Sequence, residues 1–563
     1  MPGGNNVLGP KDSPTAAEIA MNLLPCGEGL AKRQGGRRRT VGRAAAWAAL
    51  APGAKARPAV QGRTEPERGI LRRATPGPSR GRAGAFAARP GRNPPTRGLA
   101  VLALLLAALP RGSQAGEAPE SAPAPSAPSP APVSEPVEGI ATPLEAEKEE
   151  AAEPWYVLHF HFTGATQAHP AFYAKYSGAN SLSPSAEAAT AFVTGIHLGV
   201  RLWPEAEFVF DPEMSGGYGL SQTLGVAAFP SGIVYRVGNP APAIYLARLL
   251  LRQTIGLGGG TVPLEAGADD FARTRDRVAL TLTAGRLSVT DVFDGNAYAH
   301  DPETQFFNWA LFASGAWDYP ADTRGYTWGV LADLSVDWWS VKAGVALEPQ
   351  YANLLPLEWD ITKARGLMAE YDARYQLFGR HGTARVLLYL NTARMGSYAQ
   401  VLADPVAYGN SIAATRQDGR KKYGAALSWD QQVTDSLGVF VRASIDDGAT
   451  ETWAFTEIDR SLGFGAVQAG NLWGFKDYEL GGAVVIDGLS QLHRLYLQGG
   501  GYGFIIGDGQ LNYAPEVVGD FYFRVHFTDF IDASVIYQPV FNPAYNRDRG
   551  PVQVFSGRVH VAF

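Results

Sequence analysis

One stretch of the sequence, Asp291–Gly325, is rich in residue types that bind sugar-like molecules. Its aromatic residues include Phe306, Phe307, Trp309, Phe312, Trp317 and Tyr319. Its carboxylates and amides include Asp294, Asn296, Asp301, Asn308, Asp318 and Asp322. Aromatic rings present apolar faces to the C–H faces of sugars, and carboxylates and amides hydrogen-bond to hydroxyl groups. The alternative interpretation is that these rings only anchor the segment to the rest of the protein.

A few arginines could complete such a site. Arg248 and Arg252 lie four residues apart in Ile244–Gly256, and Arg286 lies in the next segment. Guanidinium groups opposite carboxylates donate hydrogen bonds and create a transverse field in a pore, although surface ion pairs of this kind often contribute little. The predicted substrate-binding and constriction residues are Arg248, Arg252, Arg286, Asp294, Asn296, Asn308, Trp309, Trp317 and Asp318.

Other chemistries find less support. His159 and His161 share one face of a predicted strand, but no third ligand follows at a zinc spacing, so we expect lumenal polar residues and no metal. The glycine run 256–260 lacks the Lys-Ser/Thr of a phosphate loop. No catalytic triad is apparent, so the sequence predicts neither catalytic residues nor a cofactor. A soluble all-β enzyme and a membrane-bound hydrolase remain alternatives.

The elements that must hold these residues are strands. In Leu367–Leu377 apolar and polar residues alternate, and after a predicted turn at 379–382 the alternation resumes through Ala384–Leu390. Segments of 9–12 residues, with tryptophans near their ends, are long enough to cross a bilayer as tilted strands with aromatic girdles. We therefore predict an all-β, antiparallel outer-membrane β-barrel of about 16 strands. Asp291–Gly325 is expected to fold inward as a constriction loop.

The C-terminal segment fits the last strand of such a barrel. Val559, Val561 and Phe563 alternate with Arg558, His560 and Ala562. This pattern places one apolar and one polar face on a closing strand. We expect the barrel-assembly machinery to recognise the strand that ends in Phe563.

The N-terminal part differs in composition. Up to Ala115 the chain has 19 Lys+Arg and 5 Asp+Glu, whereas the whole chain carries a net charge of −5. We predict a mis-annotated or disordered basic extension at 1–96, a signal peptide for Sec export at 97–115, with the apolar run Leu99–Leu109, and a Pro/Ala/Glu-rich disordered linker at 116–154. The barrel is expected at 155–563, which contains no cysteine because Cys26 is the only one.

Three segments carry a family resemblance: IYLARLLLRQTIGLGG, YAHDPETQFFNWALFASGAWDYPAD and GYTWGVLADLSVDWWSVKAGVALEP. They resemble the carbohydrate-selective porin family, often called the OprB family, over roughly 193–563. The resemblance implies a sixteen-stranded barrel in the Gram-negative outer membrane that lets neutral sugars such as glucose diffuse passively. The expected surroundings are outer-membrane lipid, lipopolysaccharide and further copies in a homotrimer, without nucleic acid. A general or other-substrate porin, and a structural barrel with an envelope-tethering arm, remain alternatives.

Overall fold

The first strand of the described region begins at Tyr156. The structure, a computed structural model, describes residues 154–563 with the exception of 235–239, 265–270, 272 and 471–476. The predicted extension at 1–96, the signal peptide at 97–115 and nearly all of the linker at 116–154 lie outside the described residues.

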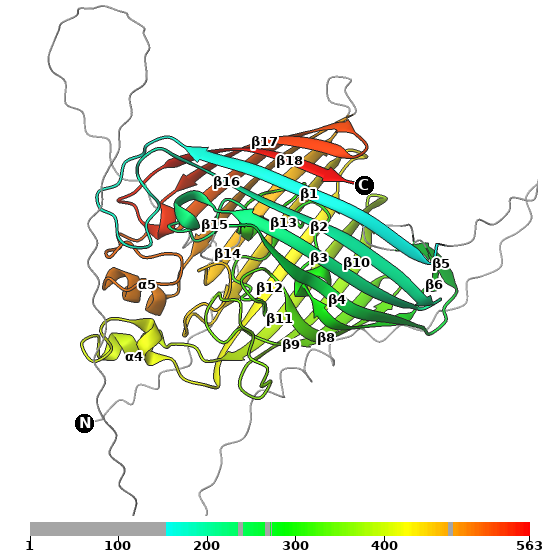
Figure 1. Cartoon of the computed structure of the whole chain (residues 1–563), viewed down its shortest axis with the longest axis horizontal. Helices are drawn as coiled ribbons and strands as arrows, with labels where there is room; N and C mark the ends of the chain where they lie inside the picture. Colours follow the sequence, from blue (N-terminus) through cyan, green and yellow to red (C-terminus); the bar gives the residue numbers. More distant parts are fainter. Residues whose placement is uncertain (1–153, 235–239, 265–270, 272, 471–476) are drawn as a thin grey trace, which may run out of the picture. The chain divides into compact units, whose positions relative to one another are not determined.

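Sixteen strands of the described region close into one antiparallel barrel, as predicted (Figure 1). Each strand pairs with its neighbours in sequence, and β1 pairs with β18 to close the ring, with Thr163 opposite His560. A separate two-stranded hairpin, β5 (Thr261–Leu264) and β6 (Arg273–Asp276), follows β4. The barrel strands are β1 (Tyr156–His169), β2 (Glu187–Trp203), β3 (Ala206–Gly217), β4 (Ala243–Gly256), β7 (Ala279–Leu287), β8 (Thr327–Val336), β9 (Trp339–Ala346), β10 (Arg365–Leu377), β11 (Arg380–Ala393), β12 (Arg420–Gln432), β13 (Leu437–Asp446), β14 (Arg460–Ala469), β15 (Tyr478–Gly488), β16 (Glu516–Thr528), β17 (Ile531–Phe541) and β18 (Val552–Ala562).

The two ends of the barrel differ. One end, here called the turn end, carries short connections such as the two residues between β8 and β9, together with the C-terminus (Figure 1). The other, the loop end, carries long connections that include α4 (Tyr398–Ala403) and α5 (Gln491–Gln498). Within the described ranges, no helix has the length and apolar character needed to cross a bilayer.

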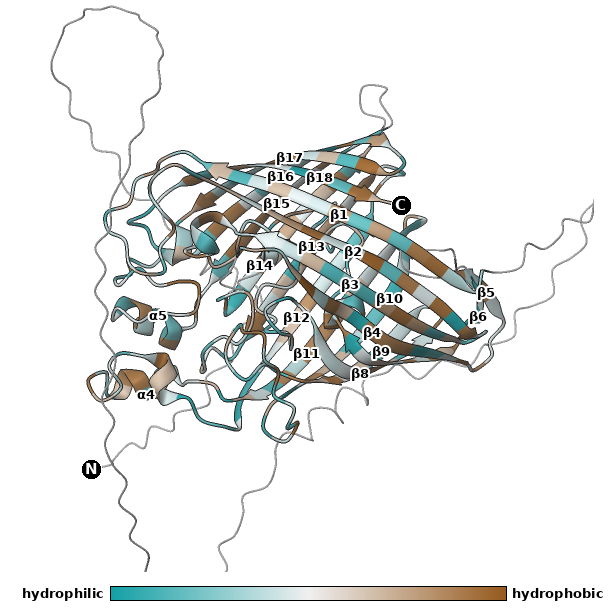
Figure 2. Ribbon diagram, viewed as in Figure 1, coloured by the Kyte–Doolittle hydropathy of each residue, from teal (hydrophilic) through white to brown (hydrophobic). Residues whose placement is uncertain are grey.

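Side chains alternate between the lumen and the outside, as the sequence pattern predicted. On β10, Leu367 and Tyr371 are exposed on the outer face, whereas Met368 and Glu370 are buried inside. Figure 2 shows the same alternation of apolar and polar residues along many strands. The β10–β11 turn lies earlier in the chain than the predicted turn at 379–382. It consists of Phe378 and Gly379, both at positive φ (52° and 74°), the backbone that matches a twisted two-residue hairpin.

A bulge in β4 changes which residues point inward. The register between β3 and β4 shifts because Asp211 lies opposite Arg248 and Pro212 lies opposite Leu246, which leaves Ala247 unpaired. An extra residue reverses the alternation on one side of a bulge. Tyr245 and Arg248, three apart, therefore both reach lumenal carboxylates.

Exposed aromatic residues gather near the strand ends. Trp155, Trp203 and Trp338 lie exposed at the turn end, as expected for an interfacial girdle. Trp453, by contrast, is fully buried and donates its indole N–H to the Pro349 carbonyl at 3.0 Å. It belongs to the interior, because the connection between β13 and β14 folds inward.

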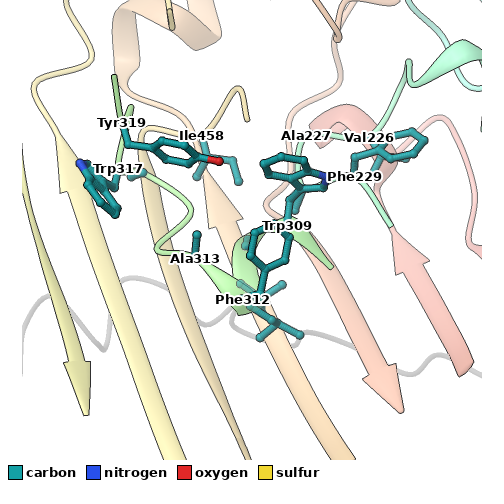
Figure 3. Packing of buried hydrophobic residues seen from close by; sticks show 14 of the residues in the cluster. Val226, Ala227, Phe229, Trp309, Phe312, Ala313, Trp317, Tyr319 and Ile458 are labelled. Carbon is teal, nitrogen blue, oxygen red and sulfur yellow. The ribbon is translucent and has the colours of Figure 1, made fainter. Parts of the chain in front are cut away.

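Connections from the loop end fill part of the lumen with a core of their own. The connections after β3, β7, β13 and β15 contribute buried apolar residues to one cluster. Figure 3 shows Val226, Phe229, Trp309, Tyr319 and Ile458 from these connections near one another, above the lumenal face of the strands. This inner core fixes the position of the constriction loop.

Candidate functional site: the lumenal constriction

The connection between β7 and β8 folds into the barrel, and Arg442 on β13 holds its first half. Arg442 is 2% exposed and forms an ion pair with Asp294 at 2.6 Å. It also donates to the carbonyls of Asp294 and Ala299 at 2.9 and 2.7 Å. The Asp294 carboxylate accepts two further hydrogen bonds from the amide and hydroxyl of Ser314. Asp294 is therefore a fixed anchor of the loop.

The two predicted asparagines also anchor the loop. Asn296 donates to the Ser428 hydroxyl on β12 at 3.1 Å, and its side-chain oxygen accepts from the Tyr298 amide. Asn308 caps the short helix α3 (Trp309–Phe312) by accepting from the Ala310 amide at 3.0 Å. The Asn308 backbone amide donates to Asp520 on β16. The loop thus bridges strands on widely separated parts of the barrel wall.

The predicted aromatic residues pack mainly against other rings. Trp309 and Trp317 are 7% and 2% exposed. Trp309 stacks on Phe455 at 4.9 Å between ring centroids, and Tyr319 stacks on the same Phe455 at 4.3 Å. The Trp309 indole N–H donates to the Ser231 carbonyl at 2.7 Å. Figure 3 shows Trp309 and Tyr319 among the other buried side chains of the inner core.

Asp318 is buried near the loop end. Its carboxylate accepts from the amides of Trp453 and Ala454 at 2.8 and 2.7 Å, and Lys422 on β12 lies 3.6 Å away. Burial raises the pKa of Asp318, although Lys422 and the two amides oppose that shift. Asp318 joins the constriction loop to the connection between β13 and β14.

The three predicted arginines lie on the same wall but differ in their contacts. Arg286 donates to the Leu246 carbonyl at 2.6 Å and pairs with Asp322 at 2.7 Å. Arg252 pairs with Glu207 at 3.2 Å. Arg248 makes a two-pronged contact with Asp291 at 2.8 and 2.7 Å, the geometry that strengthens an arginine–carboxylate pair.

A cavity of about 490 Å³ lies between the constriction loop and the turn end. It is lined by residues of β1 to β4 and β18, together with Phe563, Tyr326 and the loop. Of the nine predicted residues, Arg248 is the one that lines it. The polar residues that line the cavity are His159, His161, His197, Asp211, Glu213, Arg248, Asp301, Glu303, Tyr326 and His560.

Glu303 joins the loop to the seam where the barrel closes. Its carboxylate accepts from the Thr163 hydroxyl at 2.6 Å and lies 3.2 Å from His161 on β1 and 3.4 Å from His560 on β18. Burial disfavours the charged form of Glu303, but these neighbours outweigh burial and hold its pKa below the usual range. The seam and the constriction loop are therefore electrostatically connected.

Two carboxylates from β3 also line the cavity. Asp211 lies 2.9 Å from His197 and 3.4 Å from Arg248. Glu213 accepts hydrogen bonds from the hydroxyls of Tyr245 and Tyr326, both at 2.8 Å. The cavity thus offers fixed acceptors and a guanidinium donor to a polar solute. Nowhere in the described ranges do three or more His, Cys, Asp or Glu side chains gather as a metal site.

The sequence contained a signal for part of this lining. Asp211 and Glu213 are two residues apart, as are His159 and His161, and that spacing places both members of a pair on one face of a strand. Glu303 and Tyr326 come from the loop and its exit, so no periodicity could place them beside the closing strand.

Comparisons with known proteins agree with this architecture. Residues 180–563 match the model of the carbohydrate-selective porin, OprB family. The high-pH structure of Pseudomonas putida OprB is similar with a TM-score of 0.55 and 15% identity, over 72% of this chain and 94% of that chain. The low-pH structure of Pseudomonas putida OprB gives a TM-score of 0.40 and 13% identity, over 72% and 92%.

A third solved structure, the outer membrane channel DcaP of Acinetobacter baumannii, gives a TM-score of 0.41 and 10% identity, over 72% of this chain and 97% of that one. No curated protein matches the chain. The similarity to the high-pH structure of Pseudomonas putida OprB supports the barrel fold. The family match covers most of the sequence and nearly the whole described barrel. The chain belongs to the carbohydrate-selective porin, OprB family, and is an outer-membrane porin.

Proposed function

We propose that this porin lets neutral sugars, glucose-like monosaccharides and short oligosaccharides, diffuse passively through its lumen. The observation that carries the proposal is the 490 Å³ cavity beside the constriction loop. Its volume falls in the range of roughly 300–1,000 Å³ that is typical of small-molecule sites. Its acceptors and its guanidinium donor match the hydroxyl groups of a sugar.

Weak binding is part of this proposal. A solute must leave a channel as readily as it enters, and the cavity meets that requirement because its carboxylates already have partners. Asp211 is held by His197 and Arg248, and Glu213 by two tyrosine hydroxyls. A sugar would therefore exchange hydrogen bonds with an occupied network, with a small net gain in free energy.

The nine predicted site residues then take two roles. Arg248 contacts the solute from the cavity wall. The others position the loop or its surroundings through the contacts described above: Arg252, Arg286, Asp294, Asn296, Asn308, Trp309, Trp317 and Asp318.

The route to the membrane and the assembly state are further proposals. The apolar run in 97–115 suits Sec export, and the apolar outer face of β18, with exposed Val559 and Phe563, suits recognition by the barrel-assembly machinery. The exposed apolar strand faces would contact outer-membrane lipid and lipopolysaccharide, and would leave room for a homotrimer.

The test is single-channel current through the purified protein in a planar bilayer, titrated with glucose, maltose and gluconate. We expect saturable block by the neutral sugars, weakened in Arg248→Gln. The matched control is Arg380→Gln, which removes a guanidinium paired with Asp435 at a turn. Open channels that ignore every sugar would favour a general porin. A folded barrel without conductance would favour a structural role.

A further inference from the structure

Imidazole side chains are concentrated in the lining of the cavity. Four of the nine histidines of the chain line it: His159, His161, His197 and His560. Imidazole is the side chain whose ordinary charge change falls between pH 5 and 8. Carboxylate and guanidinium side chains ordinarily titrate outside that interval, at about pH 4 and above about pH 12. The net charge of this wall therefore depends mainly on the imidazoles.

The barrel positions these imidazoles closely. His159 and His197 lie opposite each other in the β1–β2 register, with ring centroids 6.2 Å apart. His161 reaches over β2 at Gly195, where an added Cβ would lie 2.4 Å from its Nε2. A side chain at position 195 would displace that ring. Glycine at position 195 therefore leaves room for the His161 ring.

The charged groups around the imidazoles come from every adjoining element. Asp211 and Glu213 on β3 and Asp301 and Glu303 on the loop line the cavity, with Arg248 on β4 as the cation. Arg248 is itself paired with Asp291. On the far side, Asp532 of β17 lies opposite His560 in the register and is paired with Arg524 and His526.

Formal charges give the consequence. With neutral imidazoles, the lining carries four side-chain carboxylates and one guanidinium, a net charge of −3. Protonation of the four imidazoles would bring this to +1. A negative wall concentrates cations and excludes anions, and a positive wall does the reverse.

We propose that His159, His161, His197 and His560 determine which charged solutes the porin admits. Near pH 8 the cavity favours cations and rejects carboxylate-bearing sugars, and near pH 5 it admits such sugar acids. The inference goes beyond neutral-sugar diffusion and rests on the proposed function only in requiring an open pore.

The experiment measures the reversal potential of the purified porin in a KCl gradient at pH 8 and pH 5. We expect the cation-over-anion permeability ratio to fall about threefold or more on acidification, because four charges appear within a screening length of a permeating ion. In a potassium gluconate gradient, gluconate permeation should rise over the same interval. An equal ratio at both pH values would overturn the proposal.

Substitutions locate the effect. In a variant with all four histidines changed to glutamine, the cation-over-anion permeability ratio at pH 5 should equal the ratio at pH 8. His159→Gln alone should lose part of this pH response. The single variant serves if the fourfold variant does not fold. His381→Gln, next to the β10–β11 turn and outside the cavity, is the matched control. A pH response that survives the fourfold substitution would overturn the assignment, whereas a folded barrel without current would refute the proposed function itself.

Discussion

The ion pair between Arg442 and Asp294 offers the sharpest perturbation of the constriction loop. Arg442→Met keeps much of the side-chain volume but removes the guanidinium that binds the Asp294 carboxylate and two loop carbonyls. Both side chains of the pair are 2% exposed. Among the described residues, the substitution would therefore leave the buried carboxylate with the two hydrogen bonds from Ser314.

The expected cost is large because the pair is buried. Removal of one partner of a buried ion pair costs about 3–5 kcal/mol. This corresponds to a shift of about two to four powers of ten in the equilibrium between attached and detached loop. The barrel strands pair among themselves through their backbones, so we expect the loop to detach while the barrel persists.

Single-channel conductance and heat stability in detergent report these two effects separately. We expect Arg442→Met to raise conductance and current noise, and to lower the unfolding temperature by less than a comparable change in the wall. Asp294→Asn in the Arg442→Met background should restore part of the loop attachment, because the unpaired charge disappears. Conductance and noise equal to those of the original protein would refute the claim that this pair holds the loop.

Three further substitutions test the surroundings of the loop. Asp459 is buried beside His493. Although burial opposes the shift, His493 lowers the pKa of Asp459 to about 2. The ionised Asp459 should therefore add about 2 kcal/mol to the free energy of unfolding above pH 4, and this stabilisation should be lost as pH falls toward 2. Hydrogen exchange in α5 should show this loss in the original protein and not in Asp459→Asn. Burial and the nearby Asp318 raise the pKa of Glu348, whose carboxylate lacks a hydrogen-bond partner among the described residues. Stability should therefore fall as pH rises above the usual glutamate range, so Glu348→Gln should raise the unfolding temperature at pH 8 and leave it nearly unchanged at pH 4. Trp309→Ala should lower the free energy of unfolding by about 3–5 kcal/mol as a core truncation, whereas Trp309→Phe should keep most of the unfolding temperature. If Trp309 only packs the core, sugar should block Trp309→Phe and the original protein equally. Loss of sugar block in a stable Trp309→Phe would contradict the packing role.

The barrel was predictable from sequence because strand alternation is a local property. Leu367 and Met368 point to opposite faces whatever surrounds them, and long alternating segments without an apolar helix leave a closed barrel as the arrangement that satisfies the backbone in lipid. The inward fold of the β7–β8 connection was predictable from its aromatic content. Turn positions were less predictable. Phe378 adopts a positive φ, which is uncommon for phenylalanine, so the sequence did not identify it as a turn residue.

The cavity was only partly predictable, because its lining depends on contacts distant in sequence. Glu303 reaches the seam between β1 and β18, and Thr163 and His560 lie 397 positions apart. The inward direction of Arg248 depends on a bulge at Ala247 that no local pattern marks. A tryptophan suits a sugar-stacking site and a packed core equally well, so the sequence could not assign Trp309 to either. The stacked Phe455 shows that one face of the Trp309 ring is covered.

The most direct test of sugar diffusion past this cavity is the initial rate of labelled glucose entry into proteoliposomes that contain the purified porin. The account predicts rapid entry that saturates with glucose concentration, is slowed by maltose, and loses part of its saturation in Arg248→Gln. Glucose entry no faster than in protein-free liposomes, with the barrel shown to be folded and inserted, would contradict it.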